Sequence, residues 1–457
     1  MKIIVHRGAE EIGGNCIELI SRESRILLDY GTPLPRIDPV THKSVNIPLA
    51  KAEHKIEGLY TAGKARLDGL VVSHTHQDHY GMLYGRPLSP ALPVYMSEIM
   101  EAIIRITGRM GPDHKDFAAK IEHFRKEEPF TVGAFKLTPY LMDHSASESF
   151  AFLIEAEGKK VIYTGDYREH GHRTHAFTRF LDTQMGKIDL LLTEGTQAQV
   201  ETGDNEKKVM MDIEGLIKPG SGALYVMCSG QNVDLLASLG GIAARKGRFL
   251  AIDGYVALIL ETLKTLALKQ GVKLQLPGID SAYLRVLDTP TMKNLRKYYP
   301  EAAKKISGKL VSWDWVNRNL NDLVIPVRTY AQHWVRANVK SFNNALLVYS
   351  MWEGYKEDLE YKKTLEYFKA RGMGAHSAHV SGHAYFSTIR KPEVNNRPPI
   401  YGSNAKRLFW DASRLQGFWQ FQSQCAPPAH PTSSFSLNNF PDRDFRPCQL
   451  IRHPSPV

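Results

Sequence analysis

The chain has 457 residues, of which 43% are hydrophobic and 23% charged, and 58 Lys and Arg against 48 Asp and Glu give a formal net charge of +10. This length predicts two or three globular units, and four scattered cysteines exclude a small disulfide-stapled scaffold. The N-terminus lacks the apolar core of a signal peptide and no 18-residue apolar run is present, so we expect a soluble cytoplasmic protein without a membrane partner.

Short apolar segments rich in β-branched residues predict strands through the first 200 residues. These segments are 2–7, 16–20, 25–30, 67–74, 135–142, 150–156, 160–166 and 188–195. Two helices are predicted between them, at 97–110 and 115–127. From about residue 205 strands and helices alternate, which predicts an inserted βαβ-type unit with a parallel sheet and its own core. We therefore divide the chain into 1–200, an insert at 201–345, a return segment at 346–390 and a tail at 391–457.

The positive charge is unevenly distributed along the chain. Residues 201–345 hold 20 Lys and Arg against 13 Asp and Glu, a surplus of +7, and the tail carries +4, so the remaining residues sum to −1. Ten of the 25 prolines lie in the last 67 residues, which show no sustained hydrophobic period. We expect the tail to lie outside the fold and the insert to be the basic unit.

A cluster of imidazoles and one carboxylate follows the apolar strand that ends at Val72. His74, His76, Asp78 and His79 fall within six residues, and burying such polar groups without partners costs several kcal/mol. A divalent cation removes that cost. By the period-two geometry of extended chain, His74 and His76 share one side and can hold one metal together. Asp78 and His79 then face a second metal.

Two later positions extend this cluster. His144 follows the strand that ends at Met142, and Asp166 ends the strand that includes Tyr163. Functional groups gather in loops at strand ends, so both residues are candidate ligands.

In order and spacing, the six residues resemble the ligand set of the metallo-β-lactamase superfamily. The resemblance implies an α/β fold, the αββα metallo-β-lactamase sandwich, with two Zn²⁺ ions at one sheet edge and Mn²⁺ as the alternative metal. It further implies that His74, His76 and His144 hold one zinc, that Asp78 and His79 hold the other, and that Asp166 bridges them. Two such metals share a hydroxide and neutralise an oxyanion.

Further motifs resemble the nucleic-acid-processing branch with a β-CASP insert, and ribonuclease J-like proteins in particular. They are His6 to Cys16, Leu192 to Thr196, Met227 to Asp234, and His379-Val380-Ser381-Gly382-His383-Ala384. The resemblance implies hydrolysis of phosphodiester bonds in single-stranded RNA by a metal-bridging hydroxide, with DNA as a variant substrate.

The site roles follow from the same resemblance. Asp78 would orient the hydroxide, and His383 would stabilise or protonate the leaving oxygen. Ser229 and Asn232 lie where a strand gives way to a helix, a natural phosphate site, and His379 and Ser381 would line the substrate loop. Trp313, Trp315 and Tyr330 are either core residues of the insert or base-stacking groups.

The chain departs from the family pattern after residue 390. The family supplies one more zinc-ligating histidine about 20 residues beyond the His379–Ala384 loop, whereas this chain has none before His430 and His453. We therefore expect a second zinc that lacks a ligand and an activity that is weakened. Two alternatives remain open: a small-molecule hydrolase of the same fold, such as a lactonase or thioesterase, and a catalytically impaired nucleic-acid-binding protein. Whether the chain forms a homodimer also stays open.

Overall fold

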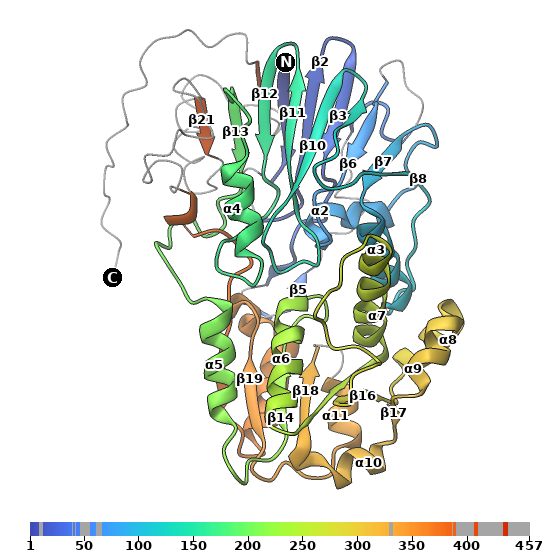
Figure 1. The fold of residues 1–457 in the computed structure, drawn as a ribbon, viewed down its shortest axis with the longest axis vertical. Helices are drawn as coiled ribbons and strands as arrows, with labels where there is room; N and C mark the ends of the chain where they lie inside the picture. The colour runs from blue at the N-terminus through green and yellow to red at the C-terminus, as the bar shows by residue number, and fades with distance from the viewer. Residues whose placement is uncertain are drawn as a thin grey trace.

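The computed structural model describes residues 1–389 except 9–11, 39, 42, 46–54, 61–65, 329–331 and 386, together with the short strands 406–409 and 433–436. Two facing sheets make one half of the molecule, and a third sheet flanked by helices makes the other (Figure 1). In the described residues no helix is both long and apolar enough to cross a bilayer.

The first sheet of the sandwich has the strand order β22-β1-β2-β3-β6-β7-β8. Its strands are β1 (Lys2–Arg7), β2 (Cys16–Ser21), β3 (Ser24–Leu28), β6 (Gly69–Val71), β7 (Pro93–Met96), β8 (Lys120–His123) and β22 (Ser433–Ser436). The strands β1, β2 and β3 pair antiparallel, whereas β3, β6, β7 and β8 pair in parallel.

The second sheet faces the first and has the order β21-β13-β12-β11-β10-β9. Its strands are β9 (Phe130–Val132), β10 (Phe135–Leu141), β11 (Phe150–Ala156), β12 (Lys159–Tyr163), β13 (Leu190–Thr193) and β21 (Lys406–Phe409). Side chains such as Leu19, Leu28, Phe135 and Phe152 are fully buried in one cluster between the two sheets. Residues from both sheets thus form the sandwich core.

Short elements complete this half. They are the hairpin β4 (Arg36–Ile37) and β5 (Ser44–Val45), the helices α2 (Gln77–Tyr80), α3 (Glu98–Met110) and α4 (Thr174–Asp182), and the 3-10 turn η1 (Gly81–Tyr84). Helix α3 begins at Ser97, whose hydroxyl accepts a hydrogen bond from the Met100 amide at 3.0 Å, as an N-cap residue does.

The third sheet is parallel and has the order β17-β16-β15-β18-β14-β19-β20. Its strands are β14 (Leu224–Met227), β15 (Phe249–Ile252), β16 (Leu284–Leu287), β17 (Leu310–Val311), β18 (Leu323–Val327), β19 (Leu346–Tyr349) and β20 (Ala375–Ser377). Both faces of such a sheet need cover, which explains the apolar runs in its strands.

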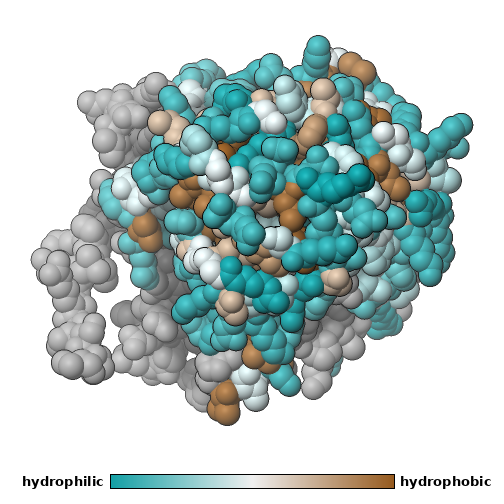
Figure 2. All heavy atoms as spheres, turned by 90° about the horizontal axis from the view of Figure 1, so that it is seen from below, coloured by the Kyte–Doolittle hydropathy of each residue, from teal (hydrophilic) through white to brown (hydrophobic). Residues whose placement is uncertain are grey.

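Helices and turns alternate with these strands. They are α5 (Glu206–Leu216), α6 (Val233–Arg245), α7 (Gly254–Lys269), α8 (Thr291–Tyr298), α9 (Pro300–Ser307), α10 (Trp313–Arg318), η2 (Leu320–Asp322), α11 (Gln332–Asn338), η3 (Glu353–Glu357) and α12 (Leu359–Lys369). Seen from below, the end of this half is mostly hydrophilic, with smaller apolar groups between polar side chains (Figure 2). The fold is thus the expected sandwich with an inserted domain.

Helix α3 joins the two halves. Its buried residues Met100 and Ile104 pack into the sandwich core, whereas Ile99 and Ile103 pack into the core of the insert beside α7. One amphipathic helix therefore contributes to two hydrophobic cores, and the insert is held against the sandwich by buried apolar contacts.

Three expectations need comment. Every strand predicted in the first 200 residues is present, but the helix predicted at 115–127 is wrong. Lys120–His123 pairs with β7 as strand β8. Phe117 and Phe124 are buried seven residues apart, a spacing that imitates a helical face, and pairing with the edge of the sheet outweighs local helix preference.

The insert also extends beyond the predicted end at residue 345. Strands β19 and β20 belong to the parallel sheet. The prediction that 346–390 returns to the sandwich is therefore wrong for residues 346–377. The chain returns to the sandwich after Ser377, where Ala384 and Ile389 pack with sandwich residues. The other domain limits stay predictions.

Eight residues of the tail pair with the sandwich. Strand β21 pairs in parallel with β13, and β22 pairs antiparallel with β1. These eight residues belong to the two sheets, contrary to the expectation for the whole of 391–457. His430, His453 and the rest of the tail lie outside the described residues.

Candidate metal centre

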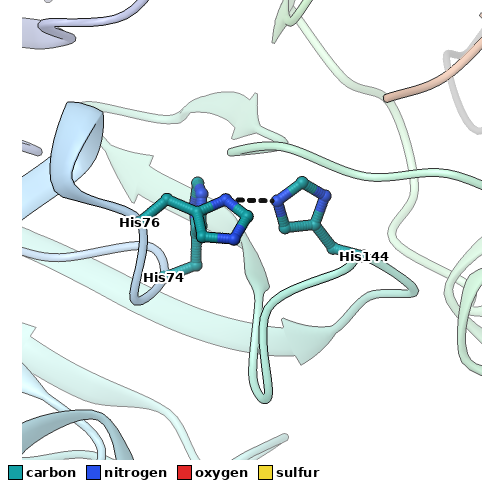
Figure 3. A group of neighbouring side chains, drawn as sticks. All are labelled: His74, His76 and His144. Atoms are coloured by element: carbon teal, nitrogen blue, oxygen red, sulfur yellow. Dashed lines mark hydrogen bonds between the residues drawn. The ribbon is translucent and has the colours of Figure 1, made fainter. Parts of the chain in front are cut away.

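The predicted ligands converge at the ends of strands. His74 follows β6, His144 follows β10, and Asp166 follows β12, while Asp78 and His79 lie in α2. Figure 3 shows the imidazoles of His74 and His76, from one loop, and of His144, from another, pointing toward one another. The sheets therefore bring residues up to 92 positions apart into one cluster, as the sequence predicts.

Helix α2 is only one turn long and needs support from the rest of the chain. The amides of Asn15 and Tyr30 donate to the carbonyls of Asp78 and His79 at 3.0 and 2.8 Å. A Cβ at Gly31 would lie 1.6 Å from the Asp78 carbonyl oxygen, so only glycine fits there. Backbone contacts rather than helix propensity thus position Asp78 and His79.

The three histidines of Figure 3 are neutral. Burial lowers the pKa of His74 and His144 well below 6.5 and also lowers the pKa of His76. The Nδ1–H of His144 donates to the Gly382 carbonyl at 2.6 Å, which leaves its Nε2 facing His76 Nδ1 at 3.0 Å. A neutral imidazole with its second nitrogen free is the form that binds metal.

His79 and Asp166 carry opposite charges. Burial alone would lower the pKa of His79, but the carboxylates of Asp166, Asp29 and Asp78 outweigh it and raise that pKa well above 6.5. Although burial opposes ionisation of Asp166, His79 and His383 hold its pKa well below 3.8. The Nε2 of His79 lies 3.3 Å from Asp166 Oδ2 and 3.8 Å from Asp78 Oδ2.

These donors fit a divalent metal. His74 Nε2 is buried with no hydrogen-bond partner among the described residues, and it lies 3.8 Å from Asp166 Oδ2. Two sets of donor atoms, His74 with His76 and His144, and His74 with His79 and Asp166, each lie within 4.8 Å of one another. A cation would satisfy the orphaned nitrogen, and imidazole with carboxylate is a donor set that suits zinc.

Asp29 is a site residue that the sequence did not reveal. Its carboxylate is fully buried and accepts hydrogen bonds from His79 Nδ1–H at 2.7 Å, the Tyr163 hydroxyl at 2.5 Å, and the amide and hydroxyl of Ser73 at 2.6 and 2.7 Å. Such a carboxylate fixes the tautomer of the ligand and orients its ring. The only sequence signal is an acidic residue at the end of a buried strand.

Glu194 is the second residue that was missed. It follows β13, and its Oε2 accepts a hydrogen bond from His383 Nδ1–H at 2.7 Å. Glu194 and Asp166 raise the pKa of His383 to about 9 against the effect of burial. The sequence segment Leu192–Thr196 marked this position but not the role of its carboxylate. His383 is therefore protonated near neutral pH and also lies 3.5 Å from Asp166 Oδ2.

The four predicted substrate residues occupy two places. Ser381 lies beside the cluster, with its hydroxyl accepting from the His383 amide at 3.1 Å. Ser229 follows β14 and is exposed, and Asn232 Oδ1 accepts from the Leu235 amide at 3.1 Å as the N-cap of α6. His379 follows β20 and is half-buried, with no hydrogen bond to Nδ1 among the described residues. Ser229 and Asn232 thus lie on the insert side, at the carboxyl end of its sheet.

A small pocket of about 70 Å³ opens beside the cluster. Its lining includes Asp78, Asp166 and His383 of the cluster, together with Arg7 of β1 and Asn15, which precedes β2. The pocket has room for several water-sized groups.

A buried arginine ties the cluster to the insert. Arg168 is fully buried, and its guanidinium lies 3.3 Å from Asp143, 3.1 Å from Glu206 and 2.6 Å from Asp234. Its Nη1 also donates to the Ser381 carbonyl at 3.2 Å. Asp143 precedes His144, while Glu206 and Asp234 belong to α5 and α6, so one side chain holds loops of the cluster and two helices of the insert.

Known proteins share this architecture. A family model described as the beta-lactamase superfamily domain matches residues 37–219. Ribonuclease J from Mycobacterium tuberculosis is 24% identical over 263 residues, covering 56% of this chain and 44% of the relative. An RNase J-like protein from Methanocaldococcus jannaschii is 27% identical over 201 residues, covering 42% of this chain and 41% of the relative. These matches span less than half the length of either relative.

A solved structure extends the comparison to nearly the whole chain. A protein of unknown function from Enterococcus faecalis V583 superposes with a TM-score of 0.63 at 17% identity, covering 95% of this chain and 99% of its own. That likeness concerns the fold alone. The beta-lactamase domain match and the ribonuclease J relatives support a ribonuclease J-like member of the metallo-β-lactamase superfamily.

Proposed function

We propose that the protein is a zinc-dependent ribonuclease that hydrolyses phosphodiester bonds of single-stranded RNA, and that its inserted unit is a β-CASP domain. The observation that carries this proposal is the neutral histidine trio around the orphaned His74 Nε2, next to an ionised Asp166 and a protonated His383. The ribonuclease J relatives support RNA as the substrate.

In this proposal His74, His76 and His144 would hold one zinc, Asp78 and His79 would hold the second, and Asp166 would contact both, with Mn²⁺ as an alternative. Zinc bound there would make a water molecule easier to deprotonate and would neutralise charge on a phosphate. Asp78 lies on the pocket wall, where its free oxygen can accept a hydrogen bond from the attacking water and orient it.

His383 acts on the other side of the phosphate. Because Glu194 Oε2 accepts a hydrogen bond from His383 Nδ1–H at 2.7 Å, the Nε2–H of the imidazolium is left to donate to the substrate. A group whose pKa is about 9 is charged at pH 7, so it can stabilise the phosphate and give a proton to the leaving oxygen. Glu194 thereby keeps the ring both charged and oriented.

The insert supplies the binding surface for the nucleic acid. Its segment 201–345 has a surplus of seven positive charges, and such a surface attracts a phosphate backbone. Helix α6 starts at Asn232, where free amides and the helix dipole favour a phosphate. Ser229 in the preceding turn, and Ser381 and His379 in the return loop, are our candidates for further substrate contacts.

The missing family histidine after residue 390 affects the site of the second metal in this proposal. With no histidine in the expected family position, the metal held by Asp78 and His79 would have one protein ligand fewer. We therefore expect weaker binding of the second metal than of the first. A cytoplasmic location and a homodimer stay predictions.

The test uses purified protein loaded with zinc or manganese and three substrates: 5′-monophosphorylated single-stranded RNA, single-stranded DNA and a lactone. The His79→Ala variant should lose RNA cleavage. The His123→Ala variant is the matched control because His123 is exposed on β8 and pairs with Glu101 at 2.8 Å, away from the cluster. Turnover of the lactone alone would contradict the proposal, and tight RNA binding without cleavage would favour an impaired nucleic-acid-binding protein.

A further inference from the structure

The carboxyl edge of the insert sheet faces the cluster. Strand β19 lies between β14 and β20, all three run in parallel, and the Ser350 amide donates to the Met227 carbonyl at 2.9 Å. The turn at Ser229, the residues after Tyr349 and the loop from His379 to His383 therefore leave the sheet at one edge. In open parallel sheets, ligands bind in the crevice at this edge.

An exposed indole stands on this edge directly after β19. Trp352 is 49% exposed, although tryptophan is highly buried on average. Its ring lies over Gly354, because a Cβ there would come within 2.3 Å of the indole carbons. Tyr355 packs edge-on against the indole, with ring centroids 5.3 Å apart and planes at 88°.

The indole is thus held in place while much of its surface stays open. The Tyr349 hydroxyl donates to the Trp352 carbonyl at 2.9 Å, which anchors the backbone at the same point. Tyr355 in turn stacks on Tyr361 of α12, with centroids 5.5 Å apart and planes at 12°. We call Trp352, Gly354 and Tyr355 the aromatic platform.

Two observations place the platform between the insert and the sandwich. The Ser44 amide of β5 donates to Asp358 Oδ2 at 3.0 Å, which joins the end of η3 to the sandwich half. Burial, Tyr361 and the carboxylate of Asp78 together raise the pKa of Tyr355 to about 12, so Tyr355 lies within electrostatic reach of the candidate metal centre. In the strand order β14-β19-β20, the platform after β19 therefore lies between the Ser229 turn and the loop from His379 to His383.

We propose that Trp352 is a stacking site for one nucleobase of a single-stranded nucleic acid that passes from the Ser229 turn to the cluster. This inference rests on the proposed function and adds a base contact to it. A flat ring that is held by its neighbours and is 49% exposed suits a base, and stacking tolerates every base because each has a π-face.

The two other tryptophans considered in the sequence differ from Trp352. Trp313 and Trp315 are partly buried against the core cluster around α10, and the Trp313 indole donates to the Asp288 carbonyl at 2.9 Å. The structure therefore uses them for packing, as expected of core residues, while Tyr330 lies outside the described residues.

The experiment measures binding of a fluorescent single-stranded RNA to the full-length, metal-free protein by anisotropy. Trp352→Ala should raise Kd about tenfold, the loss expected for one stacked base, and Trp352→Phe should retain most of the affinity. Gly354→Ala should also weaken binding, because the new methyl group displaces the indole without removing it. The matched control is Tyr283→Ala, since Tyr283 is 40% exposed immediately before β16, at the opposite edge of the sheet.

A second RNA with abasic sites along its length identifies the base contact. On that RNA wild type and Trp352→Ala should bind alike. A Kd for Trp352→Ala within twofold of wild type on normal RNA would overturn the inference, as would an equal loss on abasic RNA, which would indicate a backbone contact. If wild type binds RNA through Trp352 but cleaves none, the proposed ribonuclease activity is wrong and the stacking site stands. If wild type binds no RNA, both proposals are wrong.

Discussion

Removing the guanidinium of Arg168 should destabilise the protein strongly. The Arg168→Met variant keeps the side-chain length but leaves three carboxylates, those of Asp143, Glu206 and Asp234, in a buried site. The nearest remaining cation is Arg173, whose Nε lies 3.7 Å from Asp234. Breaking a buried ion pair from one side costs about 3–5 kcal/mol, because the other charge stays buried without a partner. We expect a loss in this range.

The assay is urea denaturation followed by circular dichroism, with EDTA present so that metal binding does not contribute. Arg179→Met is the matched control, because Arg179 is 70% exposed and its pair with Glu127 should be worth about 0–1 kcal/mol. Adding Glu206→Gln to Arg168→Met should restore part of the loss, since one buried charge is removed. If Arg168→Met lost no more stability than Arg179→Met, the reasoning that this arginine neutralises a buried cluster would be refuted.

Three further predictions concern the site. Asn232→Ala and Asn205→Ala each remove an N-cap side chain and should each cost about 1 kcal/mol of stability. Only Asn232→Ala should also raise KM for 5′-phosphorylated RNA. Equal KM values for the two variants would argue against a phosphate site at the start of α6. Asp29→Asn should weaken zinc affinity about 10–100-fold in competition with a chelator, because the acceptor of the His79 Nδ1–H loses its negative charge. Unchanged affinity would remove Asp29 from the site. In metal-free protein, the stability that His383 contributes should be fully present below its ordinary pKa of 6.5 and should be lost as the pH rises through about 9. The difference in unfolding free energy between wild type and His383→Gln, measured by denaturation at a series of pH values, should therefore shrink over that range. A difference that grows with pH would show that the sign is wrong.

The sequence predicted the cluster well because its signal is local. His74, His76, Asp78 and His79 lie within six residues after an apolar strand, and alternation along the extended chain places neighbours on defined sides. His144 follows a strand with an equally clear pattern. Such features depend on short stretches of backbone, so they can be inferred without knowing how distant segments pack.

The missed residues depend on distant partners. Asp29 is separated by 50 positions from His79, and Glu194 by 189 from His383. Neither carboxylate belongs to a local pattern that distinguishes it from any acid at a strand end. Arg168 likewise meets Glu206 and Asp234 only after the insert has folded against the sandwich.

The errors in element type and extent have a similar origin. Phe117 and Phe124 fit a helical spacing, but the free edge of β7 converts 120–123 into a strand. The predicted end of the insert at 345 failed because β19 looks like any short buried strand, and only its pairing with β14 assigns it to the parallel sheet. Register and sheet membership are tertiary properties.

The return loop has a consequence for biosynthesis. His383 reaches Glu194, and Gly382 accepts from His144 across 238 positions, so the site is completed only when the segment after β20 leaves the ribosome. At about 5–20 residues per second, translation from Asp166 to His383 takes on the order of 10–40 s. During that interval the nascent chain already carries all six predicted metal ligands but lacks the loop with Gly382 and His383. If the proposed function holds, we expect that metal can be loaded before the proposed acid, His383, has been synthesised.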